Sequence, residues 1–198
     1  MAKDKVINKK ILLLTFSDVF SWGPYYIVSS ILSIYLSKKL GVDTIKFIGI
    51  GTAIYYMTRA IVQIPVGHIS DKLKTYKDEA VMLEIGLILM GLTFILYPLI
   101  TKPVHYYLLQ LMFGTGCACN LTNWRKLFAA SVTRGEEGRQ YAFYEAAISI
   151  STSLIALIIG IIANISEKSF NIVLVVSGII MSLSSIFIFI YNRKLIKR

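Results

Sequence analysis

The fold is decided by residues 45–100, which read IKFIGIGTAIYYMTRAIVQIPVGHIS, then DKLKTYKDE, then AVMLEIGLILMGLTFILYPLI. Two apolar runs flank a short charged segment. A helix needs about 20 apolar residues to cross roughly 30 Å of hydrocarbon, and each run is long enough. The stretch therefore predicts two transmembrane helices joined by a loop at the membrane surface.

The rest of the chain repeats this pattern. Of its 198 residues, 56% are hydrophobic and 16% are charged, whereas about 25% of the residues of soluble domains are charged. A soluble domain of this composition would expose large apolar patches. We therefore predict an all-α membrane protein, a single domain over residues 1–198. Its six transmembrane helices are expected at about residues 11–36, 45–70, 80–100, 104–131, 140–164 and 170–191.

Basic residues indicate the orientation of these helices. Thirteen Lys and Arg residues fall in the two terminal tails and in the second and fourth loops, against five in the other loops. Because cytoplasmic loops carry an excess of Lys and Arg, we expect an integral protein of the cytoplasmic or inner membrane with both termini in the cytoplasm. The formal net charge of +10 then reflects topology, and no nucleic-acid partner is expected.

Polar residues recur at helical spacing on four of the six predicted helices. An ionisable side chain within the membrane costs about 2.5–3.5 kcal/mol and normally faces a bundle interior or an aqueous cavity. The third and sixth helices are nearly free of such residues and are expected to be outer, lipid-facing supports. The polar faces consist of Asp18, Trp22, Tyr25 and Ser29; Thr52, Tyr55 or Tyr56, Arg59 and Gln63; Asn120, Asn123 and Lys126; and Tyr141, Glu145, Ser149 and Thr152.

Each polar residue also has a structural interpretation. Asp18 is a candidate proton carrier or an interhelical ion-pair partner, and Glu145 is a second proton candidate that could instead reach the interface. Arg59 could bind an anionic group of a substrate or keep Asp18 ionised. Arg125 and Lys126 point about 200° apart on a helix, so one of them must meet a neighbouring helix or the headgroups. The candidates for substrate binding are Trp22, Tyr25, Tyr55, Tyr56, Arg59, Asn120 and Asn123.

Several site classes are not expected. Cys117 and Cys119 lie in an apolar run and are interpreted as packing residues, and Gly114 and Gly116 should permit close helix approach. The sequence shows no metal-ligand set, no nucleophile–base pair and no ATP-binding loop. We therefore expect no enzyme activity, no cofactor and no metal.

Motifs in the loops resemble those of the major facilitator superfamily. Gly67-His-Ile-Ser-Asp71-Lys72 is similar to the family's loop between helices 2 and 3, Gly-x-x-x-Asp-(Arg/Lys). Gln110 stands where the family has an arginine, and the fifth helix lacks the Gly-Pro motif of antiporters. Further similar motifs are Arg59, Gln63, Pro65 and Gly67 before this loop, Gly114-Thr-Gly116 on the fourth helix, and Glu136-Glu137-Gly138-Arg139 followed by Gln-Tyr-Ala.

The resemblance implies a secondary transporter, a symporter or an antiporter, that works by alternating access. It implies that helices 1 and 4 line the cavity, with helices 2 and 5 beside them and helices 3 and 6 outside. It also implies a cytoplasmic latch of Gly67, Asp71, Lys72 and Arg139. Physically, the glycine would let backbones approach, and the aspartate would gain from the dipole at a helix N-terminus.

Six helices are half of the family's fold, which is built from two six-helix halves related by an axis along the membrane normal. We expect that a homodimer completes the transporter through an isologous contact. The alternatives are an N-terminal fragment of a twelve-helix transporter, half of a heteromeric pair, or a non-transporting scaffold or receptor-like protein. The expected partners are a small-molecule solute, the lipid bilayer and a second copy of the chain.

Overall fold

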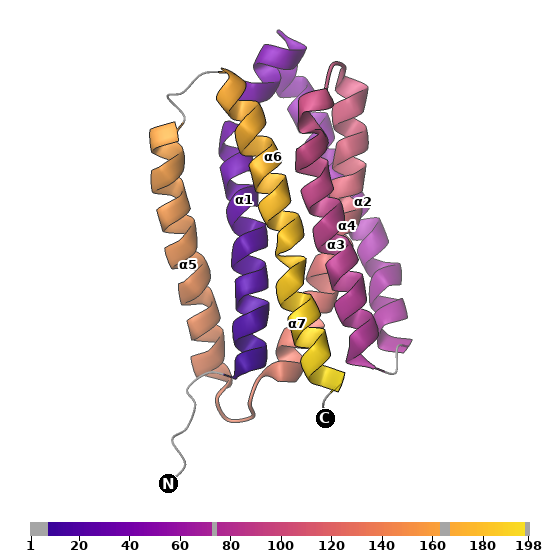
Figure 1. The fold of residues 1–198 in the computed structure, drawn as a ribbon. Helices are drawn as coiled ribbons and strands as arrows, with labels where there is room; N and C mark the ends of the chain where they lie inside the picture. The colour runs from indigo at the N-terminus through magenta and orange to yellow at the C-terminus, as the bar shows by residue number, and fades with distance from the viewer. Residues whose placement is uncertain (1–7, 73–74, 163–166, 197–198) are drawn as a thin grey trace.

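The computed structural model describes residues 8–72, 75–162 and 167–196, and this part of the chain is helical throughout with short connections (Figure 1). The prediction of an all-α chain is confirmed for these residues. The helices are α1 (Lys9–Leu40), α2 (Thr44–Lys72), α3 (Tyr76–Leu96), the 3₁₀ turn η1 (Tyr97–Leu99), α4 (Pro103–Ser131), α5 (Glu137–Ile162), α6 (Glu167–Leu183) and α7 (Ser185–Ile196).

The first helix is longer at both ends than predicted. Asn8 caps its start, where the side-chain Oδ1 accepts a hydrogen bond from the Lys10 N–H at 3.0 Å. Gly41 ends it with φ +80° and donates its N–H to the Ser37 carbonyl at 3.1 Å. Such a cap and a glycine in the left-handed region are standard helix boundaries.

The sixth predicted helix is divided at Ser184 into α6 and α7. Serine hydroxyls donate to backbone carbonyls at this point, Ser184 to Met181 at 2.6 Å and Ser185 to Ser182 at 2.7 Å. Side-chain bonds of this kind compete with the regular helical ladder at the break. The apolar run in the sequence did not predict this break.

Four helical segments of the described chain are long and apolar enough to cross a bilayer, Lys9–Leu40, Thr44–Lys72, Tyr76–Leu99 and Ser169–Arg193. α4 has a similar length but contains buried polar residues such as Gln110 and Asn120. Several side chains near the end of α5 lie outside the described residues. That all six segments span the membrane therefore stays a prediction.

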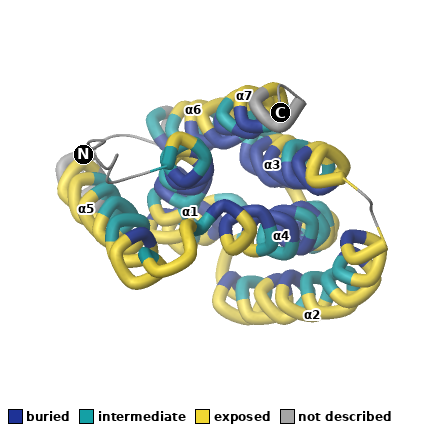
Figure 2. The backbone as a smooth tube through the Cα atoms, turned by 90° about the horizontal axis from the view of Figure 1, so that it is seen from below, coloured by how far each residue is buried: buried dark blue, intermediate teal, exposed yellow. Residues whose placement is uncertain are grey.

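The helices are arranged around α1 and α4, which occupy the middle of the bundle (Figure 2). α4 packs between α2 and α3, α6 packs against α3 and α1, and α5 packs against α1. One side of the bundle, bordered by α2 and α5, is not covered by another helix. We call this uncovered surface between α2 and α5 the open face.

Glycines set the closest helix crossings. A Cβ added to Gly86 of α3 would lie 2.7 Å from the Gly116 carbonyl oxygen of α4. A Cβ on Gly114 would lie 2.8 Å from the Tyr55 carbonyl oxygen of α2. The predicted role of Gly114 and Gly116 in close helix approach is confirmed. α4 is thereby held close to both of its neighbours.

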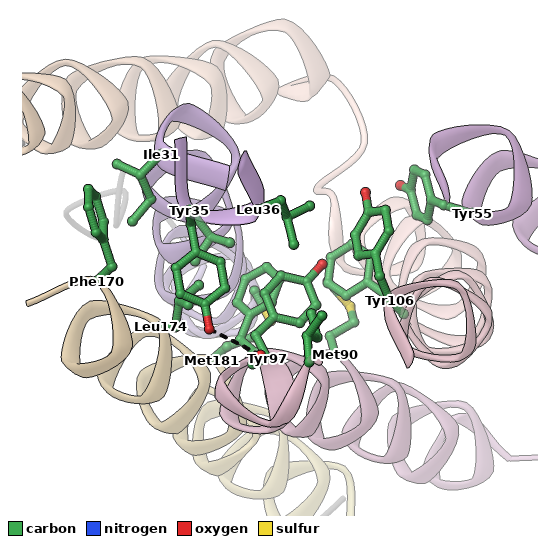
Figure 3. Close-up of a cluster of buried hydrophobic side chains, with 14 of the residues drawn as sticks. Ile31, Tyr35, Leu36, Tyr55, Met90, Tyr97, Tyr106, Phe170, Leu174 and Met181 are labelled. Atoms are coloured by element: carbon green, nitrogen blue, oxygen red, sulfur yellow. Dashed lines mark hydrogen bonds between the residues drawn. The ribbon is translucent and has the colours of Figure 1, made fainter. Parts of the chain in front are cut away.

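Two apolar clusters form the core, one near each end of the bundle. The first includes Tyr35, Tyr97 and Leu174, and the hydroxyl of Tyr35 donates to the Tyr97 carbonyl at 3.2 Å (Figure 3). The second includes Trp124 and Tyr191. The outward surfaces of α3 and α6 are aliphatic stripes at helical spacing, as expected of lipid-facing supports: Val81, Ile85, Ile88 and Leu92, and Ile172, Val176, Ile179 and Leu183.

Candidate functional site

A cavity of about 190 Å³ lies between α1, α2 and α4, with α3 and η1 behind it. Phe113 stacks on Tyr25 with ring centroids 5.7 Å apart and on Phe94 at 5.2 Å, so these three aromatic side chains of the lining pack on one another. Five tyrosines line the cavity, and Figure 3 shows three of them, Tyr55, Tyr97 and Tyr106, in one row. The five are Tyr25, Tyr55, Tyr56, Tyr97 and Tyr106.

Small and polar residues shape this cavity. Gly51 lies against the ring of Tyr106, which a Cβ would overlap, so α2 can lie directly on that ring. Gln110 donates from Nε2 to the Tyr97 hydroxyl at 2.8 Å and fixes the phenol in the wall. Gln110 therefore has a positioning role at the point where the sequence departs from the family's arginine. Sequence periodicity did not indicate Gln110 or Tyr106 as site residues, because neither belongs to the polar stripe chosen for the fourth helix.

Arg59 lies one helical turn beyond Tyr55 along α2, at the edge of the cavity. Its Nη1 donates to the Tyr55 hydroxyl at 3.1 Å, and its guanidinium carbon lies 5.5 Å and 5.0 Å from the ring centroids of Tyr55 and Tyr56. The Tyr55 hydroxyl in turn donates to Cys117 Sγ at 3.7 Å. The guanidinium is therefore held in place by aromatic groups.

Asp18 lies away from Arg59, where α1 packs against α5. Its side chain is buried, and its Oδ2 accepts a hydrogen bond from the Tyr144 hydroxyl at 2.5 Å. The charges of Glu145 and Arg125 act on it electrostatically. The structure does not bring Arg59 and Asp18 together as an ion pair: in the described chain, the pairs involve Lys126 and Arg139.

The other predicted binding residues fall in three places. Trp22 contacts Tyr25 edge to face at 5.2 Å and so adjoins the cavity. Asn120 and Asn123 are fully buried and are not among the cavity's lining residues. The Asn120 backbone lies close to Gly86 of α3, and Asn123 donates to the Cys119 carbonyl at 2.7 Å. Glu145 is exposed on α5.

The four residues of the predicted cytoplasmic latch do not form one contact. Asp71 lies in the last turn of α2, and α3 begins at Tyr76. The expectation that Asp71 gains from a helix N-terminus is therefore wrong, because α2 continues through Gly67 to Lys72. Close backbone approach at Gly67 is wrong as well, because a Cβ there would make only an ordinary 3.8 Å contact with Thr122. Arg139 pairs locally with Glu136 at 2.7 Å.

Lys126 neutralises Asp71 and joins three helices. Its Nζ lies 3.4 Å from Asp71 Oδ1 and 2.9 Å from Glu79 Oε1, and it donates to the Ser70 carbonyl at 2.5 Å. Arg125 is exposed, whereas Lys126 contacts α2 and α3, so the prediction that one of these two cations meets a neighbouring helix is confirmed. The sequence did not reveal the partners, since the helical period gives a direction on one helix but not which helix lies there.

Comparison with known proteins agrees with this arrangement. A sequence model of the Major Facilitator Superfamily matches residues 12–197, which include nearly all of the described helices. No curated protein and no solved structure gives a match to the chain. The resemblance seen in the loop motifs is confirmed. The chain therefore belongs to the major facilitator superfamily, a family of integral membrane transporters of small-molecule solutes.

Proposed function

We propose that the chain is a secondary active transporter that moves a small polar or charged solute by alternating access, as a proton-coupled homodimer. The observation that carries this proposal is the tyrosine-lined cavity with Arg59 at its edge, bordered on one side by an uncovered polar surface. A cavity with a few convergent polar groups is the usual form of a small-molecule site.

The open face supports the presence of a second copy. Arg125 and Glu145 are exposed within one chain, although both lie within predicted transmembrane segments. Ionisable side chains at this depth are too costly to face lipid. Because α2 and α5 border opposite sides of the face (Figure 2), a two-fold axis along the membrane normal would bring α2 of each copy against α5 of the other.

α2 is largely uncovered within one chain. Only 11% of the α2 span is buried within one chain, against 50% of the α1 span, which leaves α2 free for such a contact.

Proton coupling is assigned to Asp18, with Glu145 as the second candidate. A hydrogen bond from the Tyr144 hydroxyl is stronger when the Asp18 carboxyl is charged than when it is neutral. Because α5 packs mainly against α1 and this bond joins the two helices, a proton on Asp18 would loosen the attachment of α5. Uptake of a proton would thus change a contact at the border of the open face.

Transport in liposomes tests this function. The purified chain is reconstituted, a pH gradient is imposed, and proton flux is recorded with an internal pH dye during addition of sugars, organic anions, peptides and cationic drugs. We expect one class to dissipate the gradient, and Asp18→Asn to abolish this proton flux while solute exchange without a gradient persists. Folded protein that produces no flux with any class would contradict the proposal.

A further inference from the structure

The guanidinium of Arg59 has no anionic partner in the described chain. Its contacts are the Tyr55 hydroxyl and the ring faces of Tyr55 and Tyr56. We propose that Arg59 is the anchor of the substrate, and that the substrate is a small organic anion with one ring and one carboxylate. This proposal rests on the transporter function above and specifies the chemical class that the cavity binds.

The first argument is the unused hydrogen-bonding capacity of Arg59. A guanidinium has five N–H donors, arranged to bind a carboxylate through two parallel bonds. Only the bond from Nη1 to the Tyr55 hydroxyl is seen among the described residues. A half-buried cation within a membrane span normally pairs with an anion, and a bound carboxylate would supply it.

The second argument is the charge of the cavity. None of its lining residues is charged, and Arg59, which contacts the lining residues Tyr55 and Tyr56, brings a positive charge to its edge. Its polar groups are hydroxyls and one amide, including Ser29, Ser33 and Thr52 of α1 and α2. One face of the Tyr55 ring and one face of the Tyr56 ring already lie against the Arg59 cation. The site therefore favours an anion over a cation.

The third argument is size and shape. An apolar cavity of about 150 Å³ holds a benzene molecule, and the cavity measures about 190 Å³. Aromatic side chains, among them Tyr25, Phe113 and Phe94, line the cavity and provide apolar contact area for a cyclic ligand. With its ring against these side chains, a ligand would direct its carboxylate along α2 toward Arg59, about one helical turn away.

Calorimetric binding to the full chain in nanodiscs tests the proposal with three probes of nearly equal shape: benzoate, benzamide and benzylammonium. Benzoate is expected to bind at least about tenfold more tightly than the other two, because a charge-assisted hydrogen bond contributes about 1.5–3 kcal/mol. Arg59→Gln should weaken benzoate binding by at least about tenfold and leave benzamide binding unchanged. Lys46→Gln is the matched control, since Lys46 is an exposed cation of the same helix that, unlike Arg59, shows no contact with Tyr55 or Tyr56 in the described chain.

Arg59→Lys covers the case in which the glutamine variant does not fold. It retains the charge but loses the planar two-bond geometry, so benzoate binding should be weakened and still exceed benzamide binding. Equal affinity for benzoate and benzamide, undiminished benzoate binding in both Arg59 variants, or no binding of benzoate would each overturn the proposal. If a cationic or neutral solute is instead transported in the liposome assay, the anion class is wrong while the transporter function stands.

Discussion

Lys126 is the single residue on which the ends of α2, α3 and α4 converge. It faces Glu79, whose side chain is only 1% exposed, and Asp71, whose side chain is 81% exposed. The two contacts therefore differ in their contribution to the free energy of unfolding. Removing one partner of a buried ion pair leaves an uncompensated charge, at about 3–5 kcal/mol, whereas exposed pairs contribute about 0–1 kcal/mol.

Lys126→Gln is expected to destabilise the fold because it leaves Glu79 buried without its cation. The double variant Lys126→Gln with Glu79→Gln should recover most of the loss, since no charge then remains buried. Thermal unfolding in detergent measures both, and Arg125→Gln, at the exposed neighbouring position, serves as the control. A single variant as stable as the wild type would show that the Lys126–Glu79 pair contributes nothing.

Asp71→Asn is expected to act on transport with little effect on folding. The substitution retains shape and removes an exposed charge 3.4 Å from Lys126, so the change in unfolding free energy should stay below about 1 kcal/mol. Transport should slow if this contact holds α2 and α4 together during alternating access. An unchanged rate in liposomes would exclude a mechanical role for Asp71.

At the scale of helices, the close crossings are set by glycines. Gly86→Ala should lower the unfolding temperature because the added Cβ meets the backbone of α4, which has no flexible atom to yield. Gly49→Ala on α2 is the control: no atom lies within 4 Å of its Cβ, and alanine favours the helix by about 0.5–1 kcal/mol. Equal effects of the two substitutions would contradict the packing account.

Helical spacing in the sequence contains information on single helices, and this limits how much of the structure could be predicted from it. Apolar runs located the helices, and glycine pairs located a crossing, because both are properties of one or two local segments. Spacing also grouped Asn120 with a predicted cavity, although it lies near α3 at Gly86. A stripe of polar residues shows which side of a helix is polar, but it does not show which neighbouring helix lies on that side. Gln110, Tyr106 and the Lys126 contacts depend on that missing information.

At the scale of the whole molecule, the proposed dimer places α2 of one copy beside α5 of the other. Ala60 and Ser149 are both exposed, and each lies twelve residues from the same end of the bundle (72 − 60 on α2 and 149 − 137 on α5). Ala60→Cys combined with Ser149→Cys should therefore form a disulfide between chains under mild oxidation. Each single-cysteine variant controls for the native Cys117 and Cys119, and a cross-link confined to one chain would contradict the arrangement.

The most direct test of a shared transport site is to mix wild-type and Asp18→Asn chains. The two chains are co-expressed at varied ratios, and the proton-coupled flux of the purified mixture is measured in liposomes. If two copies form one transporter, an equal mixture should retain roughly one quarter of the wild-type flux, the share of random pairs that contain two wild-type chains. Flux that falls only to roughly one half, in proportion to the wild-type fraction, would show that each chain works alone and would contradict the dimeric transporter.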